Sequence, residues 1–107
     1  MKRLPVRWTA PAYEDLFEIL EFVAAGRAAA ARQLGRELLK QSKTLGIHAL
    51  RGRVLPELAQ QGVTAYREIQ VSRYRMIYHV HPEAVQISAV IDASRDFGDL
   101  LLGRLLR

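Results

Sequence analysis

Residues 63–91 read VTAYREIQVSRYRMIYHVHPEAVQISAVI and contain three strand-like runs, at 63–71, 74–80 and 85–91. β-Branched and aromatic residues, which favour strands, are frequent in each run. A two-residue turn at Ser72-Arg73 and a four-residue loop at 81–84 would join the runs into an antiparallel meander. The first turn then pairs Val71 with Tyr74, Ile69 with Met76 and Arg67 with Tyr78. The second pairs Val80 with Val85, Tyr78 with Ile87, Met76 with Ala89 and Tyr74 with Ile91.

Both turns place the apolar residues on one face of the meander, which a second layer should cover. We expect the other face to stay open as a polar and aromatic surface made of Tyr66, Glu68, Gln70, Arg75, Ile77, His79, Gln86, Ser88 and Val90. Arg67 is the exception, because it falls on the covered face. Since buried charges are rarely unpaired, we expect Arg67 to pair with a helix carboxylate such as Glu14 or Glu18.

The covering layer is predicted from the first part of the chain, which indicates a short strand and a helical hairpin. Apolar residues alternate with Arg3, Pro5 and Arg7, and a proline favours a strand at the edge of a sheet. Thr9 can cap a helix that ends at about Ala25, before Gly26. Its apolar face would hold Ala12, Leu16, Leu20 and Val23, together with Tyr13, Phe17 and Ala24. A second helix is predicted from about Ala28 to Leu45.

Two further segments complete the chain. Residues 46–62 contain three glycines and Pro56, and are predicted to be mainly a connection. A short helix, capped by Ser94 or Asp96, is expected from the apolar residues that begin at Phe97. The apolar side chains of this helix span too much of its circumference to be buried by one neighbouring element, because Leu102 and Leu106 point away from the other apolar residues. A partner chain or packing within the same domain explains this arc equally well.

The composition predicts one α+β domain spanning residues 1–107. Half of the residues are hydrophobic, a quarter are charged, and cysteine is absent, which excludes thiol chemistry. Pro5 and Arg7 interrupt any export signal and no run approaches a membrane span, so a cytoplasmic protein is expected. The net charge of +5 favours acidic partners, and the whole surplus lies in residues 1–53.

No familiar catalytic signature occurs in the sequence. His79 and His81 could face one metal ion, but no third ligand is evident, so we interpret them as surface histidines and expect no metal. Cleavage of RNA through its 2′-hydroxyl needs a base, an acid and cations, and Glu68, His79, Arg75 and Tyr66 could supply these groups. The same residue types are equally typical of a solvated sheet face.

The order strand, helical hairpin, connection and meander resembles the RelE/ParE superfamily of type II toxin–antitoxin toxins. The resemblance covers nearly the whole chain and rests on GRVLPE at 52–57, YRE at 66–68, YRMIY at 74–78 and Arg95. It implies two helices packed on an antiparallel sheet, and a cognate antitoxin that neutralises the toxin. RelE-like members cleave mRNA on the ribosome, whereas ParE-like members poison DNA gyrase.

The resemblance favours the ParE branch. Arg75 and Arg95 match the two arginines of RelE-like sites, but the lysines of the second strand are missing and the position of the C-terminal tyrosine falls at or near Leu101. We therefore expect a plasmid-stabilisation toxin that inhibits gyrase without catalytic residues or cofactors. The alternative is a ribosome-dependent endonuclease that uses Arg75, Arg95, Glu68 and His79. A plain basic interaction module without toxicity is the third hypothesis.

Contacts with gyrase or the antitoxin are expected on the open sheet face and the C-terminal helix. A homodimer or a toxin–antitoxin hetero-oligomer is compatible with such a surface. The expected contact residues are Tyr66, Arg75, Ile77, His79, Arg95, Leu101, Leu102 and Leu105.

Overall fold

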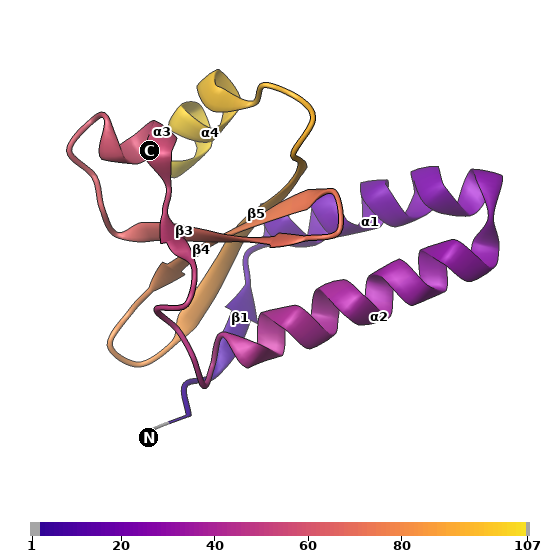
Figure 1. Ribbon diagram of the computed structural model, residues 1–107, viewed down its shortest axis with the longest axis horizontal. Coiled ribbons are helices and arrows are strands. Elements are labelled where there is room, and N and C mark those ends of the chain that lie inside the picture. The colour runs from indigo at the N-terminus through magenta and orange to yellow at the C-terminus, as the bar shows by residue number, and fades with distance from the viewer. Residues whose placement is uncertain (1–2, 107) are drawn as a thin grey trace.

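The computed structural model describes residues 3–106 and has an α+β fold built on one five-stranded sheet, with strand order β1-β5-β4-β3-β2 (Figure 1). The predicted fold class is therefore confirmed. β1 lies at an edge, as Pro5 suggested, but it runs parallel to β5, so the sheet is mixed rather than purely antiparallel. The strands are β1 (Val6–Trp8), β2 (Arg53–Val54), β3 (Tyr66–Val71), β4 (Tyr74–Val80) and β5 (Val85–Asp92).

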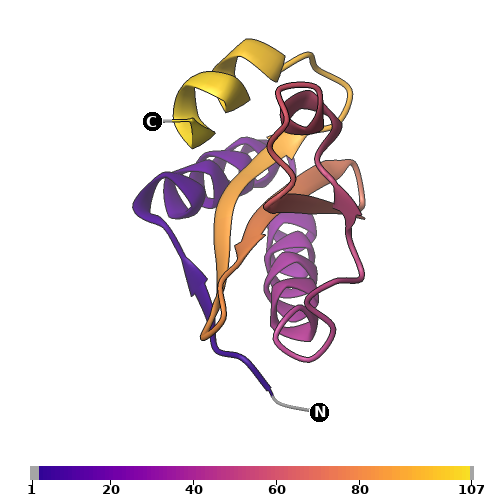
Figure 2. The ribbon, with the colours of Figure 1, turned by 90° about the vertical axis from the view of Figure 1, so that its left-hand side faces the viewer.

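The predicted helical hairpin covers one face of the sheet (Figures 1 and 2). It consists of α1 (Ala10–Gly26) and α2 (Ala28–Thr44). The Thr9 hydroxyl accepts the N–H of Ala12 and so caps α1, as predicted. Ala12 and Leu16 are buried, but Tyr13 and Phe17 are exposed, contrary to the expected face. Their rings continue an aromatic stack that starts at Trp8 on the outer side of α1, and Ala24 is exposed as well.

The first predicted turn is confirmed with its register. Val71 faces Tyr74, and the pairing continues to Tyr66 opposite His79. Ser72 has a φ of 56°, the left-handed conformation that a tight hairpin turn requires.

The second predicted register is right only near its turn. Val80 faces Val85 and Tyr78 faces Ile87, but Ile77 then faces Ala89, because a β-bulge leaves Ser88 as the extra residue of β5. The expected pairs Met76 with Ala89 and Tyr74 with Ile91 are therefore wrong. The bulge exchanges the two faces of β5, so Ala89 and Ile91 leave the hairpin side and Val90 joins it.

The sequence suggested that the second face of the sheet is open, but the structure shows that this face is partly covered. Two short helices, α3 (Pro56–Ala59) and α4 (Gly98–Leu105), pack over part of it (Figure 2). They form a second apolar core whose fully buried members are Leu55, Leu58, Ile77, Ala89 and Leu101. Residues 46–62, expected to be mainly a connection, thus include β2 and α3. This segment could not be assigned from periodicity because both elements are too short to show it.

Three further local expectations need correction. Arg67 does lie beside Tyr78, but its guanidinium donates to the backbone oxygen of Gly52 at 2.8 Å rather than to Glu14 or Glu18. Leu102 packs against the second core instead of pointing away from it. The N-cap of α4 is Phe97, although the Asp96 carboxylate accepts the N–H of Gly98 at 3.0 Å.

Within residues 3–106, no helix has the length and apolarity that crossing a membrane would require.

Candidate functional site

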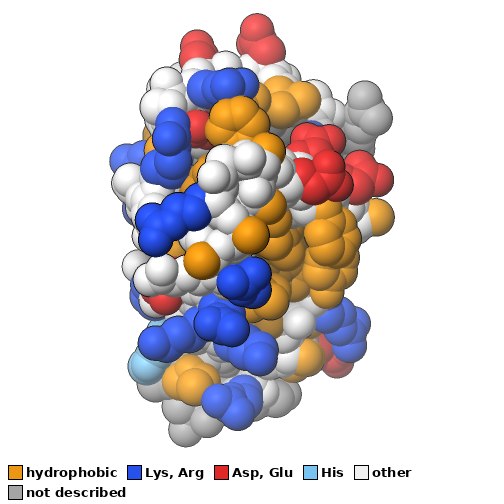
Figure 3. Space-filling model, turned by 90° about the vertical axis from the view of Figure 1, so that its right-hand side faces the viewer, with side chains coloured by type: hydrophobic (Ala, Val, Ile, Leu, Met, Phe, Trp, Pro, Cys, Tyr) orange, Lys and Arg blue, Asp and Glu red, His pale blue; other side chains and the backbone are white. Residues whose placement is uncertain are grey.

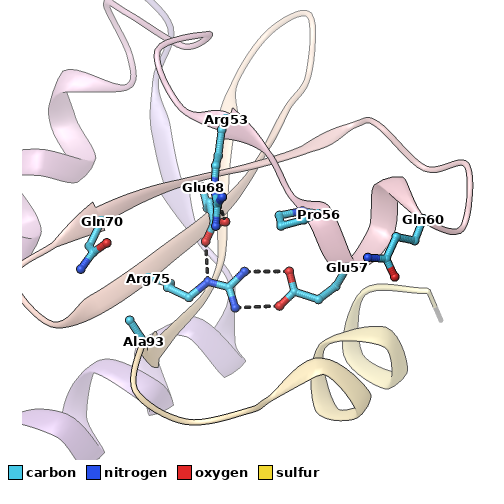
Figure 4. A pocket seen from close by; sticks show the side chains of 8 residues that line it. All are labelled: Arg53, Pro56, Glu57, Gln60, Glu68, Gln70, Arg75 and Ala93. Carbon is cyan, nitrogen blue, oxygen red and sulfur yellow. Dashed lines mark hydrogen bonds and ion pairs between the residues drawn. The ribbon is translucent and has the colours of Figure 1, made fainter.

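Four charged side chains meet on the sheet face opposite the hairpin. Arg53 lies on β2, Glu57 on α3, Glu68 on β3 and Arg75 on β4 (Figure 4). They line a hollow of about 660 Å³ that is completed by Pro56, Gln60, Gln70 and Ala93. Arg75 points away from the helical hairpin, as the predicted register of β3 and β4 required.

Two carboxylates engage all three nitrogens of the Arg75 guanidinium through three of its five N–H donors. Its Nη1 and Nη2 donate to the two oxygens of Glu57 at 2.7 and 2.8 Å, and its Nε donates to Glu68. The side chain of Arg75 is 14% exposed and that of Glu68 only 5%. The hydrogen bonds that Arg75 donates lower the pKa of Glu57, and having both carboxylates as acceptors raises the pKa of Arg75. The cluster is therefore a closed, charge-balanced network, because Arg53 also donates to Glu68 at 2.7 Å.

Gly52 and Tyr78 hold the strand that carries Arg53. The N–H of Gly52 donates to the Tyr78 hydroxyl at 3.0 Å, and that hydroxyl donates to the backbone oxygen of Ala49 at 2.7 Å. A Cβ atom at position 52 would lie 2.5 Å from the backbone oxygen of Glu68 and from the Tyr78 hydroxyl, so only glycine allows this close approach. The GRVLPE segment thus brings Arg53 to Glu68 and Glu57 to Arg75.

Arg95 does not join Arg75. It is exposed in the loop between β5 and α4 and lines a different groove, of about 620 Å³, between α1 and α4. The wall of this groove on α1 includes Glu14, Glu18 and the 81% exposed Phe22, and Leu100 lies on the opposite wall. The two arginines expected to act together therefore belong to separate hollows.

The other predicted contact residues also differ in exposure. Ile77 and Leu101 are fully buried in the second core, so they stabilise the fold and offer no surface to a partner. Tyr66, His79, Leu102 and Leu105 are partly buried. The ring of Tyr66 lies 4.9 Å from that of His79. Of the predicted set, only Arg95 is widely accessible.

Sequence reasoning did not identify Glu57 and Arg53 as the partners of the predicted site. Both lie in the GRVLPE segment, which contributed to the resemblance but was otherwise interpreted as connection. A carboxylate one residue after a proline in that segment was the available signal. Its contact with Arg75 depends on the placement of α3, which no local pattern defines.

The basic surplus of residues 1–53 is concentrated on one helix. α1 carries Glu14, Asp15, Glu18 and Glu21 and no lysine or arginine, whereas α2 exposes a stripe of cations three or four residues apart. The stripe consists of Arg32, Arg36, Lys40 and Lys43. Figure 3 shows most of the basic side chains at the left and bottom of the face in view, a cluster of acidic ones at the upper right, and apolar ones at the centre and right.

Among residues 3–106, no three side chains of His, Cys, Asp or Glu are grouped so that they could hold a metal ion. A metal site in this part of the chain would need another type of ligand.

Comparison with known proteins identifies one family and one fold. A family model described as the ParE toxin of the type II toxin-antitoxin system parDE matches residues 6–97. A solved structure described as the chromosomal ParDE TA system from P. aeruginosa superimposes with a TM-score of 0.69 and 19% sequence identity, covering 84% of this chain and 96% of that chain. At that identity the likeness shows the fold alone. No curated protein matches the sequence significantly.

Proposed function

Because the chain belongs to the ParE toxin family of type II toxin–antitoxin systems, we propose that it inhibits DNA gyrase and that a cognate antitoxin neutralises it. The inhibition would be non-enzymatic: the toxin binds gyrase and traps the complex in which DNA is cleaved. Such a toxin acts in the cytoplasm and stabilises the replicon that encodes the module.

The contacts of Arg75 with two carboxylates carry the choice of a non-enzymatic mode. A cation that stabilises the developing charge of a phosphorane must have free donors aimed at the phosphate oxygens. Three of the five N–H donors of Arg75 already bind Glu57 and Glu68, and two carboxylates beside the guanidinium offset its charge and would repel a phosphate. An endonuclease role would require the network to open.

The placement of the other expected groups supports the same choice. Glu68 is buried between two arginines, so it is a poor candidate for moving protons in an open site. Arg95 lines another groove. The four groups of the endonuclease alternative thus do not surround one reacting atom in this conformation.

We further propose that the accessible part of the predicted surface makes the partner contacts. Arg95 is its centre, and the exposed Phe22 and Leu100 line the same groove. Exposed apolar side chains beside charged ones are typical of a protein interface. Ile77 and Leu101 are fully buried, so they contribute by stabilising the fold rather than by touching a partner.

A supercoiling assay with purified gyrase and relaxed plasmid tests this function. The toxin should inhibit supercoiling, increase the cleaved DNA recovered after detergent and protease treatment, and lose both effects when its antitoxin is added in equimolar amount. Arg95→Ala should weaken inhibition. Arg36→Ala is the control for loss of a cation, because Arg36 is exposed on α2 and does not line the groove that contains Arg95. A toxin that leaves gyrase active and instead gives codon-linked mRNA cuts in primer extension would reverse the assignment.

A further inference from the structure

Large apolar side chains are exposed along one outer face of the helical hairpin. Phe17 of α1 is 59% exposed and its ring stacks on that of Tyr13, which stacks in turn on Trp8 of β1. Leu39 of α2 is exposed as well. Apolar side chains that lie together at a surface are available to a partner.

Two rows of opposite charge border these apolar side chains. The acidic row on α1 consists of Glu14, Glu18 and Glu21, and the basic row on α2 is the stripe of Arg32, Arg36, Lys40 and Lys43. A helix turns by about 100° per residue, which places the acidic row on the side of Phe17 away from α2 and the basic row on the side of Leu39 away from α1. Among residues 3–106, no member of either row forms an ion pair within the chain.

The contact between Leu20 and Gly35 shows which charges of the two rows lie level with each other. A Cβ atom at Gly35 would lie 3.4 Å from Leu20, and the two helices run in opposite directions (Figure 1). Positions counted equally far from this contact, backward on α1 and forward on α2, are therefore level. Glu18 is thus level with position 37, next to Arg36. The same count makes Glu21 level with Arg32 and Arg36, and Glu14 level with Lys40 and Lys43.

We propose that this face joins two copies of the chain in a symmetric dimer, with the twofold axis along the seam between α1 and α2. Such an axis keeps the height of every residue and exchanges the two sides, so the acidic row of each copy lies on the basic row of the other. The apolar side chains of the two copies meet along the axis. A partner with one sign of charge would be attracted by one row and repelled by the other, whereas a second copy brings both signs in the required order.

The face is large enough for a weak dimer. Each helix has 17 residues and is therefore about 25 Å long, and two helices side by side are about 20 Å wide. The face thus measures about 500 Å² on each copy, or about 1,000 Å² in the dimer, which is the lower limit for a specific interface. We therefore expect a dissociation constant on the order of micromolar rather than an obligate dimer.

This dimer is independent of gyrase inhibition. Its face shares with the groove that contains Arg95 only the rim formed by Glu14 and Glu18. A homodimer was expected to use the open sheet face and the C-terminal helix, whereas the two charge rows favour the hairpin. Neither a failure to inhibit gyrase nor a loss of antitoxin binding would bear on it.

Charge reversal followed by sedimentation equilibrium of the tag-free chain tests the twofold geometry. The unmodified chain should dimerise in about 50 mM NaCl and dissociate more readily in about 500 mM NaCl, which screens the two rows. Glu18→Lys and Arg36→Glu should each raise the dissociation constant by about tenfold or more, because each dimer then contains two contacts between like charges. An equimolar mixture of the two variants should form a heterodimer, since every contact between the rows again joins opposite charges.

Glu37→Lys is the matched control, because it makes the same change of charge on the exposed flank of α2 that faces away from α1. It should dimerise like the unmodified chain. Phe17→Ser removes an exposed ring, so it should weaken the dimer and preserve the fold, which circular dichroism can verify.

Four results would each overturn the proposal. They are an unmodified chain that stays monomeric at about 200 μM, a dimer that neither charge reversal weakens, a mixture that forms no heterodimer, and an equal loss of affinity in Glu37→Lys.

Discussion

Asp15 on α1 and Arg104 on α4 form a two-point ion pair across 89 positions of sequence, with nitrogen–oxygen distances of 2.6 and 3.2 Å. The same carboxylate accepts the backbone N–H of Val90 on β5 at 3.0 Å. The bulge at Ser88 interrupts the ladder just before this residue. One aspartate thus ties the hairpin, the central sheet and the C-terminal helix together.

Replacing Asp15 with alanine should therefore destabilise the fold. The change leaves the N–H of Val90 without its acceptor and Arg104 without its partner, and such losses cost about 2–3 kcal/mol in the free energy of unfolding. Urea denaturation followed by circular dichroism measures the effect. Glu14→Ala, one position earlier and exposed, is the control and should cost less than about 0.5 kcal/mol. Similar costs for both variants would contradict the proposed role of Asp15.

A double-mutant cycle should reveal strong coupling between Arg75 and Glu57. The bidentate pair is mostly shielded from solvent, so Arg75→Met and Glu57→Gln should interact by about 1–3 kcal/mol. The pair formed by Arg73 and Asp92 is the internal comparison. Its arginine is 63% exposed, and exposed pairs contribute less than about 1 kcal/mol. Equal coupling in the two cycles would show that burial does not strengthen the Arg75 network.

Acid should weaken the fold partly through Glu57. Arg75 lowers the pKa of this carboxyl in the folded chain below the ordinary value of 4.5. The unfolded chain therefore binds its proton first as the pH falls, and the stabilisation present above pH 4.5 is lost as the pH drops through the folded pKa. Unfolding measured between pH 7 and pH 3 should show a smaller decline for Glu57→Gln. An identical pH dependence in both chains would exclude this contribution.

Two glycines should respond to alanine in opposite directions. At Gly52 the added Cβ would lie 2.5 Å from backbone and hydroxyl oxygens, so Gly52→Ala should cost about 2 kcal/mol or more. At Gly103, inside α4, no atom lies within 4 Å of the added Cβ, and alanine should stabilise the helix by about 0.5–1 kcal/mol. Thermal unfolding of both variants provides the measurement. A tolerated Gly52→Ala would mean that the segment before β2 can shift freely.

The parts of the fold that could be predicted from sequence are those with long periodic patterns or decisive turns. α1, α2 and the register of β3 with β4 follow from apolar spacing, Thr9 and the turn at Ser72. The bulge at Ser88 could not be predicted, because the apolar residues of β5 fit either face equally well. Residues 89–91 are all apolar, so no alternation of polar and apolar side chains shows that the register shifts there.

The candidate site could be predicted only in part, for the same physical reason. The side of the sheet on which Arg75 lies depends on one tight turn and was predicted correctly. Its engagement by Glu57 depends on α3, a helix of four residues that packs through Leu58. Short elements are positioned by tertiary contacts, so sequence periodicity carries no information about them.

The pairing of β1 with β5 delays completion of the sheet while the chain is being synthesised. Val6 leaves the ribosome long before its partner Val85, which belongs to the last strand of the sheet. At ordinary translation rates, on the order of ten seconds pass between the two. During that interval the apolar side of α1 and α2 lacks the β5 residues that bury it. The nascent chain is therefore open to a binding protein before the sheet closes, and contacts of such long range also slow folding after release.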